Sequence, residues 1–271
     1  MVVQHNLTAM NANRQLSGVQ NAQQKSTEKL SSGYRINRAG DDAAGLSISE
    51  KMRSQIRGLN KAVSNAQDGI SLVQVAEGAL NETHSILQRM NELATQAAND
   101  TNTSTDRNAL QKEMDQLTSE IDRIRSTTQF NSMNLLDGTF KNMKLQVGAL
   151  SGQKISISIG NMNSSKLKIS GLKVSSFSSA GKAMTAIQKA INSVSTERSK
   201  LGALQNRLEH TINNLDTASE NLQTAESRIR DTDMAEEMVN YSKNNILAQA
   251  GQSMLCLLYT SPSPRDLSTS R

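Results

Sequence analysis

Apolar residues return every seven positions along two long stretches of the chain. The first series runs through Met52, Leu59, Ala66, Val73, Leu80, Leu87 and Ala94. The second runs through Ile187, Val194, Leu201, Leu208, Leu215, Leu222 and Ile229. A heptad repeat of this length is typical of helices that pack along a coiled-coil seam. It predicts one helix over about residues 44–99, with Ser47 and Glu50 at capping-box spacing, and another from residue 181 through Asp231–Met234 to about residue 254.

A shorter helix is predicted between these two. The polar residues 99–106 end the first helix, and a stripe that steps by four and three follows them. The stripe consists of Leu110, Met114, Leu117, Ile121 and Ile124. A short polar break between two amphipathic helices favours an antiparallel helical hairpin.

The periodicity changes between residues 129 and 178. Lys144–Val147 and Lys154–Ile159 alternate polar and apolar residues, with Ser151 and Gly152 between them. Alternation on both sides of a turn predicts a β-hairpin, to which Lys166–Ile169 is expected to add a third strand. The region is rich in Ser, Gly and Asn, so we expect a connector or a variable insert.

Both ends of the chain carry narrow apolar stripes. Helix stability comes mostly from burial, so helices over residues 4–31 and 236–255 need partners that cover them. We expect these segments to be poorly ordered in the monomer and to become ordered when neighbouring copies bury the stripes. The candidate polymerisation residues are Leu7, Met10, Leu16, Met238, Tyr241 and Leu247.

The whole pattern predicts a mainly α fold, in which long antiparallel coiled-coil helices form an extended multi-helix rod with a small β-hairpin region. The expected segments are an N-terminal polymerisation segment and linker (1–43), a coiled-coil helical hairpin (44–128), a β-hairpin connector (129–180), a coiled-coil helix (181–235), a C-terminal polymerisation helix (236–255) and a disordered tail (256–271).

Composition favours long seams over a compact core. Aromatic residues make up 2% of the chain, so aliphatic side chains must supply the buried area. The net charge is +5 with both signs interleaved, and no Lys/Arg cluster is interleaved with aromatics, which argues against nucleic-acid binding. The apolar runs are too short to span a membrane, and the N-terminus lacks the pattern of a secretory signal.

The residues that usually carry chemistry are scattered. Cys256 is the single cysteine, so no disulfide or thiolate metal site forms within one chain. Asp41 and Asp42 precede a predicted helix, where negative charges interact favourably with the helix dipole. Glu236 and Glu237 point about 100° apart on a helix, so they do not converge easily on one site. The histidines are far apart in the sequence, at His5, His84 and His210. We therefore expect no enzyme, no metal and no cofactor.

Three segments closely resemble the signatures of bacterial flagellins. They are LSSGYRINRAGDDAAGLSI at 30–48, TQFN and LLDG at 128–131 and 135–138, and AESRIRDTDMAEE at 225–237. The resemblance covers residues 1–255 apart from the middle, and the short middle implies little or no outer variable domain. It implies a structural subunit that leaves the cell by type III export and polymerises with itself into the extracellular filament for motility. It also implies contacts with an export chaperone and with capping and junction proteins.

The resemblance further implies recognition by Toll-like receptor 5. Residues 87–94, LQRMNELA, resemble the receptor-facing motif, with Arg89, Leu93 and, across the hairpin, Glu113 at the positions that matter most. Arg89 and Leu93 are four apart and lie off the Leu80–Leu87–Ala94 series, which predicts that both face outward. The alternative is a solvated Arg89 and a Leu93 that flanks the seam.

Two other classes of protein remain open. A flagellar hook–filament junction protein shares the terminal helices, although the signature around Arg35–Ser47 favours a filament subunit. A coiled-coil scaffold unrelated to flagella would leave the signatures unexplained. After Leu255 the tail, with Pro262 and Pro264, departs from the flagellin pattern, and we expect it to truncate the C-terminal helix.

Overall fold

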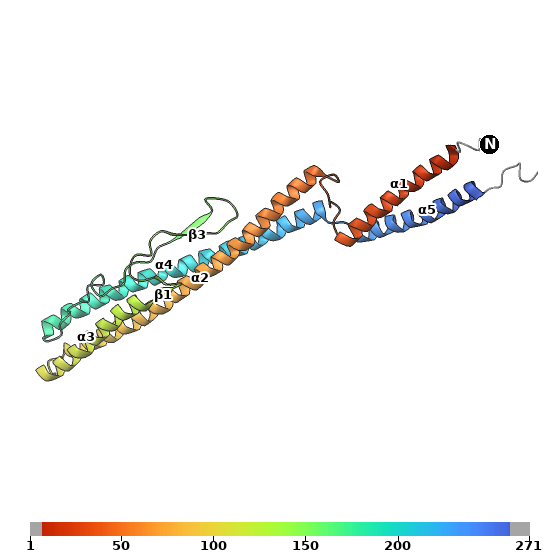
Figure 1. The fold of residues 1–271 in the computed structure, drawn as a ribbon. Helices are drawn as coiled ribbons and strands as arrows, with labels where there is room; N and C mark the ends of the chain where they lie inside the picture. Colours follow the sequence, from red (N-terminus) through yellow and green to blue (C-terminus); the bar gives the residue numbers. More distant parts are fainter. Residues whose placement is uncertain (1–6, 261–271) are drawn as a thin grey trace, which may run out of the picture. The chain divides into compact units, whose positions relative to one another are not determined.

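The computed structural model describes residues 7–260, and helices make up most of that part of the chain (Figure 1). The helices are α1 (Leu7–Ser32), α2 (Ala43–Ala97), α3 (Ser104–Thr127), α4 (Phe177–Arg230) and α5 (Met234–Thr260). The chain divides into two units, one from Met1–Ser54 with Asn221–Arg271 and the other from Gln55–Glu220. The predicted mainly α fold is confirmed. Across residues 7–260, no helix is both long and apolar enough to cross a membrane.

The predicted heptad seam forms the core of the Gln55–Glu220 unit. Most of its α2 and α4 members are almost completely buried, namely Ala66, Val73, Leu80, Leu87 and Ala94 on α2, and Ile187, Val194, Leu201 and Leu208 on α4. Leu59, near the end of the unit, is half-buried. The two helices are antiparallel, because Ser219 Oγ donates to Asn60 Oδ1 at 2.9 Å while Arg198 pairs with Glu77 at 3.6 Å. The heptad pattern therefore predicted the packing face correctly.

α3 lies beside α2 as the predicted helical hairpin. Thr103 caps α3 in a capping box with Asp106, and Met114 and Ile121 bury its inner face. Because α3 packs on α2 in addition to α4, a wider part of the α2 surface is buried than the seam with α4 alone would cover. Met90 and Leu93, outside the series of sevens, are therefore completely buried as well.

A small β region packs on the same unit. β3 (Met143–Gln146) pairs antiparallel with β4 (Lys154–Ile157), as the alternation predicted. A second antiparallel pair, β1 (Gln129–Phe130) with β2 (Met133–Asn134), was not predicted from the sequence. Two glycines of α2 allow this close approach. A Cβ at Gly58 would lie 2.9 Å from Ala149 Cβ, and one at Gly69 would lie 2.9 Å from Leu145 Cδ1.

The third strand predicted at Lys166–Ile169 is wrong. Leu167 N donates to Asn163 O and Ile169 N to Ser164 O, so the backbone bonds within a local turn, and Lys168 takes φ 58°. The alternation itself was meaningful, because Leu167 and Ile169 are buried while both lysines are exposed. Among residues 7–260 the sheets are the two pairs β1–β2 and β3–β4.

The continuous helix predicted through residues 231–233 is also wrong. Asp231 forms an antiparallel bridge with Tyr34, and Thr232 N donates to Gly33 O at 3.0 Å. Asp233 then starts α5, since its Oδ1 accepts hydrogen bonds from Ala235 N and Glu236 N. These contacts draw the backbone out of the helical path and divide the predicted helix into α4 and α5.

Two predicted helix ends also differ in the structure. The cap of α2 is Asp42, whose Oδ1 accepts from Gly45 N at 2.8 Å, and not Ser47 with Glu50. α5 continues past Leu255 through Cys256 to Thr260. The predicted disordered tail therefore begins as helix, and its remaining residues, 261–271, lie outside the described part of the chain.

Candidate functional site

α1 and α5 pack against each other as an antiparallel pair (Figure 1). Near one end of the pair α5 approaches Leu16 at Gly251, where an added Cβ would lie 3.2 Å from Leu16 Cδ1. Near the other end Lys29 Nζ lies 3.5 Å from Glu237 Oε2. Leu16, Ser26 and Glu237 are the buried residues of this pair among residues 7–257. With so little buried apolar surface, the pair is expected to be marginally stable alone.

The outer faces of α1 and α5 leave many large apolar side chains in solvent. Nine of the fifteen exposed large apolar residues of the described chain lie on these two helices: Leu7, Met10, Met234, Met238, Val239, Ile246, Leu247, Met254 and Leu257. Monomeric proteins rarely leave contiguous apolar surface in solvent, so such a face marks an interaction site. Met238, Val239 and Ile246 also line a shallow groove of about 550 Å³.

The predicted polymerisation residues separate into two groups. Leu7, Met10, Met238 and Leu247 are exposed, with 74%, 65%, 58% and 46% of their surface in solvent. Leu16 is 9% exposed and Tyr241 is half-buried. The sequence predicted that neighbouring copies bury the whole stripe. Leu16 instead packs between α1 and α5 of one subunit, so it is not available to neighbouring copies.

Two of the sequence signatures, 30–48 and 225–237, meet where α4 ends. Arg35 N donates to Arg230 O at 2.7 Å, and Gly33 takes φ 75°, which glycine adopts without strain. The Tyr34 ring lies under Arg230, whose guanidinium is 4.7 Å from the ring centroid. Arg230 also pairs with Glu50 at 2.9 Å. Residues 33–35 and 229–232 therefore form a paired connection at the base of the α1–α5 pair.

The adjacent carboxylates have structural roles. Asp41 Oδ2 accepts hydrogen bonds from Arg38 N and Asn37 N, which lower the pKa of this carboxyl below its usual value. Glu237 pairs with Lys29, while Glu236 is exposed. Residues 7–260 hold no group of three His, Cys, Asp or Glu side chains arranged for a metal ion. His5 lies outside the described residues.

Arg89 and Glu113 form an exposed ion pair across the α2–α3 hairpin. Arg89 lies 2.9 Å from Glu113 and 3.2 Å from Glu92, and hydrogen bonds to Glu113 and then Glu92 raise the pKa of the guanidinium above its usual value. Half of the Arg89 side chain is in solvent. The prediction that Leu93 faces outward is wrong, because Leu93 is completely buried. It lies four residues after Arg89, on the face of α2 from which Arg89 reaches α3.

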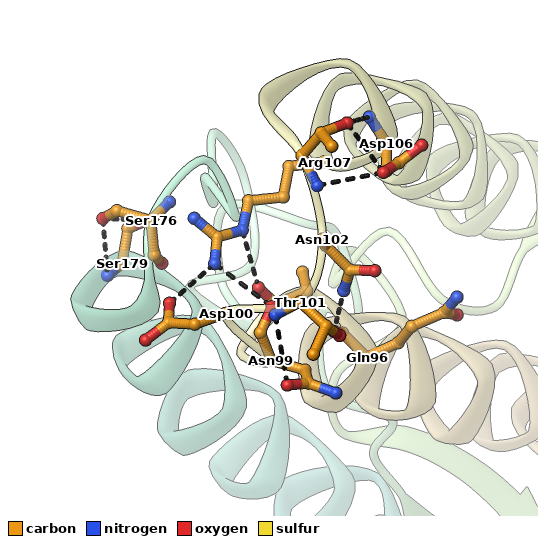
Figure 2. Close-up of polar contacts among 11 residues, drawn as sticks. Gln96, Asn99, Asp100, Thr101, Asn102, Asp106, Arg107, Ser176 and Ser179 are labelled. Carbon is orange, nitrogen blue, oxygen red and sulfur yellow. Dashed lines mark hydrogen bonds and ion pairs between the residues drawn. The ribbon is translucent and has the colours of Figure 1, made fainter.

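The register that places Glu113 beside Arg89 is fixed at the closed end of the hairpin. Figure 2 shows Arg107 of α3 reaching back to the end of α2, where it donates to Ala97 O at 3.1 Å and Asn99 O at 3.2 Å and pairs with Asp100 at 2.9 Å. Carbonyls at a helix C-terminus lack partners in the helix, and a cation satisfies them well. Arg107 thus joins the end of α2 to the start of α3.

Comparisons with known proteins match both ends of the chain. The bacterial flagellin N-terminal helical region matches residues 3–141, and the bacterial flagellin C-terminal helical region matches residues 184–262. A flagellin of Halalkalibacterium halodurans is 56% identical over 257 residues, covering 94% of each chain. A flagellin of Bacillus subtilis is 49% identical over 290 residues, covering 94% of this chain and 95% of its own.

Two solved structures resemble this one. The Bacillus cereus flagellin is 35% identical with a TM-score of 0.51, over 56% of this chain and 88% of its own. A putative flagellar hook-associated protein of Vibrio parahaemolyticus has a TM-score of 0.59 over 70% of this chain and all of its own, but at 14% identity it shows the fold alone. The family matches and the identity to the relatives therefore decide between filament subunit and junction protein: the chain belongs to the bacterial flagellins, the non-enzymatic structural subunits of the extracellular flagellar filament.

Proposed function

We propose that the chain polymerises by burying the outer faces of α1 and α5 against neighbouring subunits. The observation that carries this proposal is the concentration of exposed apolar side chains on these two helices, led by Leu7, Val239, Ile246 and Leu257. The α1–α5 pair has few buried contacts of its own, so neighbouring copies supply the surface that covers it.

The free energy gained by burying these side chains indicates that each subunit needs contacts with several neighbours. Burying one large apolar side chain contributes roughly 1.5–3 kcal/mol. Half of the nine exposed residues would together contribute on the order of 10 kcal/mol, against an association cost of about 4–15 kcal/mol. One neighbour therefore gives weak binding, whereas several neighbours around each helix pair give a stable filament.

Seeded polymerisation tests the proposal. The double variant Val239→Ser with Ile246→Ser is expected to stay monomeric at concentrations where the parent chain forms filaments in electron micrographs. The matched control is Met143→Ser with Leu150→Ser, which removes exposed apolar residues from the β3–β4 hairpin. Deleting residues 1–30 is also expected to abolish filaments while residues 55–220 stay folded by circular dichroism. Filaments from the deletion variant or from the Val239/Ile246 variant would refute the proposal.

We also propose that the outer face of the α2–α3 hairpin is recognised by Toll-like receptor 5. The exposed Arg89, held between Glu92 and Glu113, supports this proposal because it offers a partner a fixed cation beside two carboxylates. Leu93 contributes by packing beneath this face and not by contact, since it is buried.

A receptor reporter assay in cultured cells tests this second function. Arg89→Ala is expected to weaken the response at least about tenfold, because the exposed cation that the partner contacts is lost. Arg123→Ala is the matched control, because Arg123 is an arginine of α3 that is also more than half exposed and also pairs with a glutamate, Glu120. Equal responses from the two variants would exclude a specific role for Arg89.

A further inference from the structure

One long stretch of this sequence contains lysines and no acidic residue. Residues 138–196 hold eight lysines and no Asp, Glu or Arg, although the whole chain has 30 basic and 25 acidic residues. The formal charge of this stretch is therefore +8 in a chain of net charge +5. The prediction that the two signs of charge are interleaved is therefore wrong for residues 138–196.

Folding gathers four of the eight lysines around one groove. Lys182 and Lys189 line it from α4, and Lys166 and Lys168 line it from the turn that Leu167 anchors in the core. Lys182 and Lys189 are seven residues apart and so lie on one helix face, about 10 Å from each other. The groove encloses about 660 Å³, within the usual range for ligand sites.

The groove has the electrostatics of an anion site. All four lysines are exposed, and within residues 7–260 none of them has a carboxylate at ion-pair distance. The residues that line the groove include no Asp or Glu. A groove lined by charges of one sign concentrates ions of the opposite sign.

The groove also carries hydroxyl groups between the lysines. Thr185 Oγ1 donates to Gly181 O at 3.1 Å and Ser193 Oγ donates to Lys189 O at 2.9 Å. Because each hydroxyl hydrogen is used inside the helix, each oxygen is left to accept a hydrogen bond. The groove therefore suits a ligand that combines anionic groups with O–H donors.

We propose that this groove binds an anionic polysaccharide, with its sulfate or phosphate esters on Lys166, Lys168, Lys182 and Lys189 and its sugar hydroxyls on Thr185 and Ser193. A sugar chain supplies both the charge and the O–H donors that the groove accepts. The lining contains no aromatic residue on which the bases of a single-stranded nucleic acid would stack. The proposal is independent of how the terminal helices assemble.

Heparin, a sulfated polysaccharide, is the probe for a direct test with the full-length monomer. Binding is followed by fluorescence anisotropy, with neutral dextran and an oligo(dT) strand in parallel. With four lysine contacts, heparin affinity is expected to fall about 50-fold between 50 and 200 mM salt. The variant Lys166→Gln, Lys168→Gln, Lys182→Gln, Lys189→Gln is expected to lose this binding together with its salt dependence.

The other four lysines of the stretch provide a control with the same change of charge. Lys141, Lys144, Lys154 and Lys173 are exposed and lie outside the groove, so replacing all four with Gln is expected to leave heparin binding within twofold. Gly181→Gln tests the groove without changing charge, since a Cβ there meets open space and the longer side chain obstructs the ligand.

Equal losses in the two four-lysine variants would show diffuse attraction and overturn the proposed site. Oligo(dT) binding as tight as heparin would overturn the assignment to polysaccharide. Unchanged heparin binding by Gly181→Gln would place the ligand elsewhere. Circular dichroism of each variant confirms that the helices are retained.

Discussion

The contact between Leu16 and Gly251 is expected to control whether α1 stays paired with α5 in the free subunit. Leu16 is the one large aliphatic residue buried in this pair among residues 7–257. Truncating a core leucine to Ala costs about 2–5 kcal/mol, and a site covered by a single helix belongs near the lower end. A loss of about 2 kcal/mol corresponds to a roughly 30-fold larger population of the unpaired state. Leu and Ala are both good helix formers, so the change isolates packing from helix propensity.

Hydrogen exchange of the monomer measures this population directly. Leu16→Ala is expected to accelerate exchange of the α1 and α5 amides while leaving residues 55–220 unchanged, because local opening exposes those amides. Leu7→Ala is the matched control: it is the same substitution in the same helix, at a side chain that is 74% exposed. Leu7→Ala is expected to leave exchange unchanged and to weaken filament formation. Equal exchange in Leu16→Ala and the parent chain, or equal acceleration by Leu7→Ala, would refute the reasoning.

A double-mutant cycle extends the test to the facing residue. Gly251→Ala gains up to about 1 kcal/mol of helix propensity but crowds Leu16, since the new Cβ lies 3.2 Å from Cδ1. Leu16→Ala removes the crowded atom, so Gly251→Ala is expected to stabilise the pair more in that background than in the parent chain. Additive effects of the two substitutions would show that these residues do not touch in solution.

Three further predictions concern the Gln55–Glu220 unit. Leu87→Ala, in the buried seam, is expected to lower the free energy of urea unfolding by about 2–5 kcal/mol, whereas Leu150→Ala at an exposed site is expected to change it by less than about 0.5 kcal/mol. Glu197→Ala leaves Gly160 N without its 2.9 Å acceptor and is expected to cost about 1–3 kcal/mol, and Glu197→Gln less because its amide oxygen still accepts. Hydrogen bonds from Thr103 Oγ1 and then Thr103 N lower the pKa of Asp106, so its stabilisation of α3 is present above the usual value of 3.8 and is lost as the pH falls through the lower folded value. Thr103→Val is expected to raise the pKa of Asp106 toward 3.8 in an NMR titration, and an unchanged pKa would contradict this assignment.

Sequence periodicity predicted the parts of the fold that depend on local order. The series through Leu80 and Leu87 identified the buried face of α2 because each helix turn repeats the same contact with α4. Leu93 is misplaced because the series of sevens marks one strip of α2, whereas Arg89, four residues earlier on the same face as Leu93, reaches Glu113 of α3. Its burial depends on a third helix whose position the heptads of α2 do not encode.

Contacts between distant segments account for the other errors. The break at residues 231–233 depends on Thr232 bonding to Gly33, a residue that lies far away in the sequence. A local signal was present in the spacing of Asp233 and Glu236, which resembles the capping-box spacing of a helix start. The sequence also indicated the basic groove, because no acidic residue occurs between 138 and 196. Only the fold shows which four of the eight lysines share the groove.

The antiparallel pairing of α2 with α4 limits how this chain can change length during evolution. Removing seven residues from α2 alone would slide every later contact with α4 by about 10 Å, separating pairs such as Glu77 and Arg198. Loss of seven residues from both helices at the same level would keep the seam intact. Insertions and deletions in the paired helices are thus expected only as matched heptads, whereas an exposed turn such as residues 150–152 is not bound by this constraint. The seam therefore confines length variation to the residues between the two helical ends of the sequence.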